Sequence, residues 1–202
     1  MVKLTKLFTR EHTLFYCSVW AQSDIETYNL KTVLFIREGE ADKVSVWYDK
    51  NELDSILSRI IDQLNTNEKL VWKIEDTFEK YWKLLKVYLK EGKQIQNIDE
   101  LKKYYKNLIR WWRAMAIITV APDADWLDEK IKKRLIKMRD LTQEYTDNAD
   151  KVFTDFFEKN FSEYKDITYL ISPNEIFSIK NRKISKKKLD EIKKRKKGFF
   201  LY

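Results

Sequence analysis

The chain has 202 residues, of which 44% are hydrophobic and 14% aromatic, and its formal net charge at pH 7 is +8. This composition is typical of a folded protein and excludes an intrinsically disordered chain. One cysteine, Cys17, and one histidine, His12, exclude an internal disulfide and a Cys/His zinc site, and three scattered glycines exclude a glycine-rich phosphate loop.

Residues 1–30 contain several aromatic side chains and predict a short helix or an irregular lead-in. They show no continuous apolar stretch of the kind found in signal peptides, so we expect a cytoplasmic protein. The longest apolar run, Ala114 to Pro122, is less than half of the length that a membrane span needs. We therefore also expect no membrane-spanning segment.

Residues 32–48 predict a small β-hairpin. The stretch from Thr32 to Ile36 is rich in β-branched and aromatic residues, and Gly39 marks a turn. After the turn, valine and tyrosine alternate with other residues as far as Tyr48. Because an isolated hairpin is only marginally stable, we expect it to pack on helices or to pair with another strand.

Helical periodicity dominates the chain after the hairpin. Apolar residues recur at steps of three and four within residues 53–64, 70–89, 101–118, 127–145 and 152–161. Few glycines and prolines interrupt these stretches, which favours long helices over a β-sandwich. The predicted fold is therefore mainly α, a helical bundle of four to five long helices with a small β-hairpin.

Several residues mark the expected helix ends. Asp49 and Asn97 each precede a glutamate by three residues, which is the pattern of a capping box. Gly92 predicts the end of the second helix, since glycine favours the left-handed conformation that follows many helices. Asp123 or Asp125 is the predicted N-cap of the fourth helix.

Four acidic residues cluster at that fourth helix start: Asp123, Asp125, Asp128 and Glu129. Capping and the helix dipole favour acidic residues at such a position, so a structural role is the favoured interpretation. A magnesium site or an acid/base pair is the alternative. The prediction includes no metal site, no catalytic residue and no cofactor, because His12 and Cys17 also lack a recognised catalytic spacing.

The C-terminal part begins after a short apolar stretch, residues 167–171, which predicts a strand. Ser172, Pro173 and Glu175 then combine an N-cap, a proline at the first helical position and a glutamate at the third. A last helix follows, with a narrow apolar stripe.

We divide the chain into a helical body, residues 1–171, and a basic C-terminal segment or junction, residues 172–202. The apolar residues 198–202 predict a strand start. They are expected to pair with the hairpin, to dock on the helices or to lead into a further domain.

The positive charge is concentrated near the C-terminus. Residues 180–197 contain eleven lysines and arginines and two acidic residues, a net charge of +9, which leaves −1 for the rest of the chain. Such a density supports nucleic-acid binding through counterion release. A solvated helix face or a charged linker is the alternative. The candidate nucleic-acid-binding residues are Lys186, Lys187, Lys188, Lys193, Lys194, Arg195, Lys196 and Lys197.

The stretch "YYKNLIRWWRAM" is the most distinctive part of the helical body. Pairs of aromatic residues lie seven positions apart and share a broad helix face. They predict either a pocket for a planar ligand, a stacking platform for bases, or core packing between neighbouring helices. The candidate ligand-binding residues are Tyr105, Trp111, Trp112 and Arg113.

The C-terminal stretch resembles a segment of the phosphoenolpyruvate-utilising enzymes, a group that includes phosphoenolpyruvate synthase and rifampicin phosphotransferase. The matching parts are Ser172 to Ile176, Leu189 to Lys197 and Gly198 to Tyr202, and the opening from Lys6 to Trp20 is similar to the start of the helical region in small proteins of this group. The resemblance covers most of the chain and implies a helical region that binds an acceptor or links domains.

That family transfers phosphate through a histidine in a glycine-rich Ser-His segment, which would follow Tyr202, and binds nucleotide in an ATP-grasp domain. Neither part is present in this sequence, and His12 lies at the wrong end to replace the carrier. We therefore expect a non-catalytic helical domain, either a fragment or a subunit of an ATP- or phosphoenolpyruvate-dependent phosphotransferase, that holds a small molecule or a partner domain. The alternative is a standalone protein that binds nucleic acid or a protein partner through its basic C-terminal segment.

Overall fold

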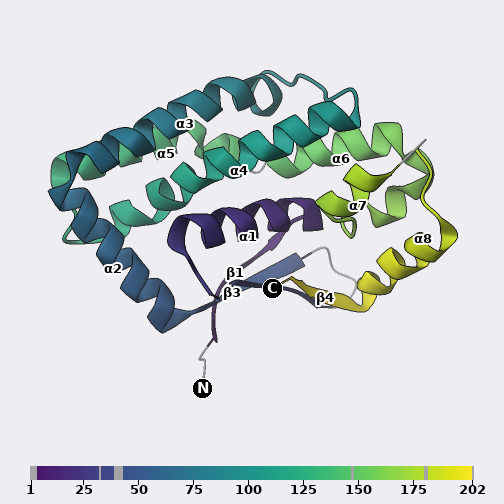
Figure 1. Cartoon of the computed structure of the whole chain (residues 1–202), viewed down its shortest axis with the longest axis horizontal. Coiled ribbons are helices and arrows are strands. Elements are labelled where there is room, and N and C mark those ends of the chain that lie inside the picture. The colour runs from purple at the N-terminus through teal and green to yellow at the C-terminus, as the bar shows by residue number, and fades with distance from the viewer. Residues whose placement is uncertain (1–3, 32, 39–42, 147, 180–181, 202) are drawn as a thin grey trace.

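The computed structural model describes residues 4–31, 33–38, 43–146, 148–179 and 182–201. The chain is mainly helical, and a small antiparallel sheet lies along one side of the helices (Figure 1). This confirms the predicted fold class at the level of a mainly α protein with a small β element. The strands are β1 (Leu4–Glu11), β2 (Val33–Glu38), β3 (Lys43–Asp49) and β4 (Gly198–Leu201). The helices are α1 (Leu14–Tyr28), α2 (Lys50–Thr66), α3 (Glu68–Leu89), α4 (Ile98–Val120), α5 (Glu129–Thr146), α6 (Asn148–Asn160), α7 (Pro173–Ser178) and α8 (Lys186–Lys193), with short 3-10 helices η1 (Ala121–Asp123), η2 (Ser162–Ile167) and η3 (Lys194–Lys197).

The predicted hairpin forms the middle of a four-stranded sheet. Strands β2 and β3 pair antiparallel, and the strand order is β1-β3-β2-β4. The predicted turn at Gly39 lies outside the described residues. Strand β4 pairs with β2, with Gly198 opposite Glu38, so the C-terminal apolar residues pair with the hairpin. A side chain at Gly198 would approach the backbone oxygen of Arg37 to 2.9 Å, which explains the glycine at the start of this strand.

Helix α1 lies between the sheet and α4 in Figure 1, and it contacts both β2 and α4. It is buried on several faces, including those of Phe15, Cys17 and Val19. The exposed residues of α1 lie towards its C-terminal end, at Gln22, Ile25 and Glu26, so its first half lacks the polar stripe that marks a surface helix. Helix α4 in turn packs against α3 and α5, and α2 leads from the end of β3 towards α3 (Figure 1).

Three local predictions were wrong. Residues 4–11 form strand β1, whose side chains are largely exposed at the edge of the sheet, so they lack the alternation that marks a half-buried strand. Residues 167–171 end a 3-10 helix and form a turn rather than a strand, although the stretch is buried. Asp128, and neither Asp123 nor Asp125, accepts the backbone N–H groups of residues 130 and 131 at the start of α5.

The other cap predictions are confirmed in their main part. The Asp49 side chain accepts the first amides of α2, and the Asn97 side chain accepts an amide of α4 at 2.9 Å. Ser172 forms a complete capping box at the start of α7. The carboxylate of Glu52 accepts the backbone N–H of Lys31 at 2.9 Å, so it does not return to the cap residue Asp49. Among the helices of the described residues, none combines the length and the apolar character that a membrane crossing requires.

Candidate functional site

A cavity of about 550 Å³ lies at the junction of β1, β3, α1, α2, α4 and α5. Its walls are mainly apolar and aromatic, with a few charged and polar groups, which is typical of small-molecule sites. We call it the Asp24 cavity. Its lining includes Trp20, Asp24, Tyr28, Tyr48, Trp112 and Arg139.

Helix α1 supplies one wall of the Asp24 cavity. Trp20, Asp24 and Tyr28 follow one another at steps of four residues, so they lie on one face of the helix. Asp24 is 2% exposed although it is an acid, and the hydroxyl of Tyr48 on β3 donates a hydrogen bond to its Oδ2. The arrangement therefore places a carboxyl group in a mainly apolar wall.

Burial raises the pKa of Asp24 to about 7, although hydrogen bonds from Tyr48 and Trp20 act in the opposite direction. Desolvation dominates because these two donors are neutral, whereas a carboxylate in an apolar environment lacks the water that would stabilise its charge. The Asp24 carboxyl is consequently able to change its protonation state near neutral pH.

Three buried polar atoms of the lining residues have no hydrogen-bond partner within the part of the chain that the structure describes. They are Oδ1 of Asp24, the hydroxyl of Tyr28 and Nε1 of Trp112. Such atoms are rare in folded proteins, because each costs about 1–3 kcal/mol when it loses water without gaining a partner. Atoms of the same kind also occur outside the lining, for example on Thr27 and Trp111, but these three belong to residues that share one cavity.

The wall opposite α1 comes from α4 and α5. Trp112 packs edge-to-face on Trp20, with ring centroids 5.2 Å apart. Arg139 lies at the α5 side and contacts Asp123 at 3.4 Å and Asp140 at 4.0 Å. Both acidic partners are exposed, so solvent screens these contacts, and they orient the Arg139 side chain without enclosing its charge.

The structure separates the four predicted ligand-binding residues. Trp112 lines the Asp24 cavity, whereas Trp111 is fully buried and stacks on Trp82 with centroids 5.9 Å apart. Tyr105 packs edge-to-face on Phe15, with centroids 5.0 Å apart. Arg113 forms an ion pair with Glu26. Of the four, Trp112 is the one that lines this cavity.

Some residues of the basic segment form ion pairs that join α8 and η3 to α7 and η2. Arg195 contacts both carboxylate oxygens of Glu175, at 2.6 and 2.7 Å, and Lys188 contacts the same group at 2.8 Å. Lys193 and Lys196 lie 3.1 and 3.7 Å from Asp166. The remaining candidates are exposed and have no ion pair with any described residue: Lys186, Lys187, Lys194 and Lys197.

The histidine, His12, lies between β1 and α1 and contacts α6. His12 Nδ1 lies 2.6 Å from Asp150, whose other carboxylate oxygen accepts the backbone N–H of Thr13 at 3.0 Å. Burial raises the pKa of Cys17 well above its usual value, so its thiol stays protonated and unreactive. Both side chains therefore belong to the packed interior of the protein.

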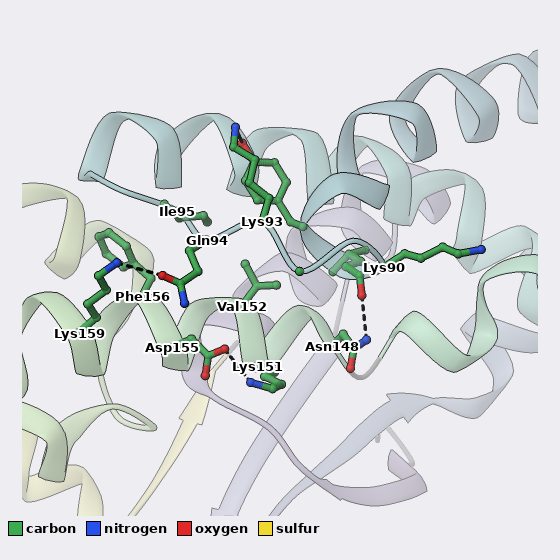
Figure 2. Close-up of a pocket in the computed structure, with 13 residues that line it drawn as sticks. Lys90, Lys93, Gln94, Ile95, Asn148, Lys151, Val152, Asp155, Phe156 and Lys159 are labelled. Carbon is green, nitrogen blue, oxygen red and sulfur yellow. Dashed lines mark hydrogen bonds and ion pairs between the residues drawn. The ribbon is translucent and has the colours of Figure 1, made fainter.

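A second cavity, of about 410 Å³, lies between the α3–α4 connection and α6 (Figure 2). Its polar side chains mostly bind one another. Lys159 contacts Gln94 at 2.9 Å, Lys151 contacts Asp155 at 2.7 Å, and Asn148 donates to the backbone oxygen of Leu89 at 2.8 Å, as Figure 2 shows. Because these groups already have partners, this cavity is a weaker candidate than the Asp24 cavity.

The acidic residues at the start of α5 take part in contacts within the chain. Asp128 caps the helix and Asp123 pairs with Arg139. Throughout the described residues, no group of three or more His, Cys, Asp or Glu side chains could hold a metal ion.

Sequence reasoning missed Asp24, Tyr28 and Tyr48. A signal for the first two was present, since Trp20, Asp24 and Tyr28 recur every four residues and an acid between two aromatic residues on one buried face is unusual. Tyr48 gave no such signal, because only the folding of β3 onto α1 brings its hydroxyl to Asp24.

The fold and the Asp24 cavity define a mainly helical protein with a small-molecule-sized cavity beside its sheet. Comparison with models of known protein families gives no match, and neither curated proteins nor solved structures give one. The resemblance to phosphoenolpyruvate-utilising enzymes therefore stays a prediction.

Proposed function

We propose that this chain is a binding domain for a small molecule, and that the ligand occupies the Asp24 cavity. The observation that carries the proposal is the set of three buried polar atoms around one cavity, on Asp24, Tyr28 and Trp112, that have no partner among the described residues. The proposal keeps the non-catalytic binding role implied by the resemblance. It centres the site on Asp24 and Trp112 rather than on Tyr105, Trp111 and Arg113.

The volume and the chemistry of the walls support this function. A cavity of about 550 Å³ is in the range of small-molecule sites, and its mainly apolar walls favour the binding of a ligand with an apolar body. A ligand that hydrogen bonds to the three polar atoms would also remove the desolvation penalty of the empty site. Both terms favour the bound state.

A fragment screen followed by NMR tests the proposal. The indole N–H signals report on the seven tryptophans separately, and a ligand in the Asp24 cavity is expected to shift those of Trp20 and Trp112. The exposed Trp72 and Trp126 are internal controls whose signals should stay in place. If no fragment shifts the cavity signals at millimolar concentration, the proposed function is wrong.

A blocking variant makes the test specific. Thr119 is an exposed residue of α4 that lines the Asp24 cavity, so Thr119→Phe should reduce fragment affinity at least tenfold with little loss of stability. The matched control is Lys106→Phe, which adds the same ring to an exposed position of the same helix away from the lining. Equal binding by both variants would place the ligand elsewhere.

A second candidate function is nucleic-acid binding, favoured by the four exposed lysines of the basic segment that lack ion pairs within the described residues. Replacing Lys186, Lys187, Lys194 and Lys197 with glutamine should abolish binding to a single-stranded oligonucleotide and flatten its salt dependence. This variant spares the Glu175 contacts, which deletion of the segment would remove. The control replaces four exposed lysines of α3 and α5: Lys69, Lys73, Lys133 and Lys137.

A further inference from the structure

We propose that the ligand of the Asp24 cavity is an organic cation, whose charged nitrogen binds Oδ1 of Asp24 and packs against the surrounding aromatic rings. The inference rests on the proposed binding function and specifies the chemical class of the ligand. It follows from the hydrogen-bond partners of the carboxyl group, from the nature of the walls and from the charges around them.

The hydrogen bonds of Asp24 leave one oxygen for a cationic partner. Its Oδ2 accepts from the hydroxyl of Tyr48, and the other donor to this carboxyl in the described structure is the indole of Trp20. Both donors are neutral. Oδ1 is buried and lacks any hydrogen-bond partner in the described residues. A buried carboxylate is stable only when it is paired with a positive charge, and none of the described residues places one at hydrogen-bonding distance from Asp24.

The rings around Asp24 suit the same ligand. Trp20, Tyr28, Tyr48 and Trp112 all line the cavity. The faces of such rings carry negative electrostatic potential, and several rings around one acidic group form the arrangement with which proteins recognise alkylammonium ions. The edge-to-face contact of Trp20 and Trp112, with an interplanar angle of 63°, prevents the two rings from covering each other.

The other charged groups of the cavity do not favour an anion. Among the described residues, two basic side chains line the cavity. Arg139 from α5 contacts Asp123 and Asp140, and Arg10 from β1 also takes part in an interaction within the chain. An anion near Asp24 would meet a carboxylate instead of a partner. The titratable or charged side chains that line the cavity are Arg10 from β1, Asp24 and Tyr28 from α1, Tyr48 from β3, Asp123 from η1 and Arg139 from α5.

Protonation of Asp24 gives this ligand class a specific pH dependence. The cation requires the ionised carboxyl, whose pKa in the empty cavity is about 7. A quaternary ammonium keeps its charge at every pH, so its affinity should rise about tenfold between pH 6 and pH 8 as Asp24 loses its proton. The affinity of a neutral ligand of the same shape should change little over this range.

Calorimetric titration with matched probes tests the inference. We expect phenethylammonium to bind the wild-type chain at pH 8 at least tenfold more tightly than the neutral 2-phenylethanol, and 3-phenylpropanoate to bind most weakly. Asp24→Asn should reduce the affinity for phenethylammonium at least tenfold and leave that for the alcohol within threefold. The control is Asp54→Asn, at an exposed position of α2, which should leave all three affinities unchanged.

The pH profile of benzyltrimethylammonium binding to the wild-type chain provides a second test that needs no variant to fold. A flat profile between pH 6 and pH 8 would overturn the inference. So would equal or tighter binding of the alcohol or the carboxylate, or failure of both ammonium probes to bind. In these cases fragment shifts at Trp20 and Trp112 would still support the proposed binding function. Absence of any such shift would reject the binding function itself.

Discussion

Two buried carboxylates, Asp24 beside the sheet and Glu175 at the start of α7, are stabilised in opposite ways. Burial tends to raise the pKa of Glu175, but hydrogen bonds from Arg195, Lys188 and the Ser172 backbone outweigh it, and the pKa falls to about 2. Burial also raises the pKa of Asp24, and there the neutral donors leave it at about 7. The difference lies in the charge of the partners and also in the degree of burial, since Asp24 is 2% exposed and Glu175 is 9% exposed.

The two carboxylates differ in whether the described chain provides a counter-charge. At Glu175 the chain supplies its own counter-charges and joins the C-terminal helices to the body. At Asp24 a cavity adjoins the carboxyl group and one oxygen has no partner in the described chain. A buried charge that the fold neutralises indicates a structural role, whereas one left beside a cavity indicates a binding site.

The largest expected effect is on the pH dependence of stability. The folded pKa of Asp24 lies above that of an unfolded aspartate, so its contribution to stability is complete below about pH 4 and is lost as the pH rises through about 7. Between pH 5 and pH 8 the wild-type chain should lose about 2 to 3 kcal/mol from this group, and Asp24→Asn should not. Urea unfolding at both pH values measures the difference.

Asp54→Asn is the control for this prediction, because Asp54 is exposed. It should retain the wild-type pH dependence, and a wild-type slope in Asp24→Asn would contradict the raised pKa. Glu175 affects stability at low pH. Its folded pKa lies below that of an unfolded glutamate, so its contribution is present above about pH 4 and is lost as the pH falls towards 2.

The next effect is the loss of the counter-charge at Glu175. Arg195→Leu should lower the free energy of unfolding at pH 7 by about 2 kcal/mol, since it leaves a buried carboxylate without its main partner. The value lies below that for a fully enclosed pair because the Arg195 side chain is 27% exposed. The neighbouring Lys194→Leu is the control, and equal destabilisation by both variants would show that the ion pair contributes little.

Removal of Tyr48, one of the two neutral donors to Asp24, should have a smaller effect that depends on pH. Tyr48→Phe should destabilise the chain by about 1.5 kcal/mol at pH 8, where the hydrogen bond serves a charged carboxylate, and by less at pH 5. Chemical denaturation at both pH values measures it. Tyr105→Phe removes a long, exposed hydrogen bond to Gln22 and should have little effect at either pH. A pH-independent change in Tyr48→Phe would indicate lost packing instead.

The smallest effect is expected at Lys188, the second partner of Glu175. Its side chain is 42% exposed, so solvent screens the contact. Lys188→Met should lower the free energy of unfolding by about 0.5 kcal/mol. A loss as large as that of Arg195→Leu, measured in the same urea experiment, would mean that both cations are needed to neutralise Glu175.

Features set by neighbouring residues were predictable from the sequence. Asp49, Asn97 and Ser172 cap helices whose first amides lie within three positions of them. Strand β1 was not predicted because its residues are mostly exposed and show no apolar alternation. Its extended conformation is stabilised by pairing with β3. The Trp111 and Trp112 pair was recognised, but adjacent positions on a helix face different neighbours, and only the packed structure shows that Trp112 is the one beside the cavity.

The mainly helical class, most helix starts and the concentration of positive charge near the C-terminus can be predicted from the sequence. These properties depend on local spacing and composition. The tertiary structure decided which carboxylates have counter-charges, because Glu175 meets Arg195 across 20 residues and Asp24 meets Tyr48 across 24. Burial and the pairing of charges arise from contacts between distant segments, and no local pattern specifies that Asp24 lies beside a cavity with one oxygen that lacks a partner in the described structure.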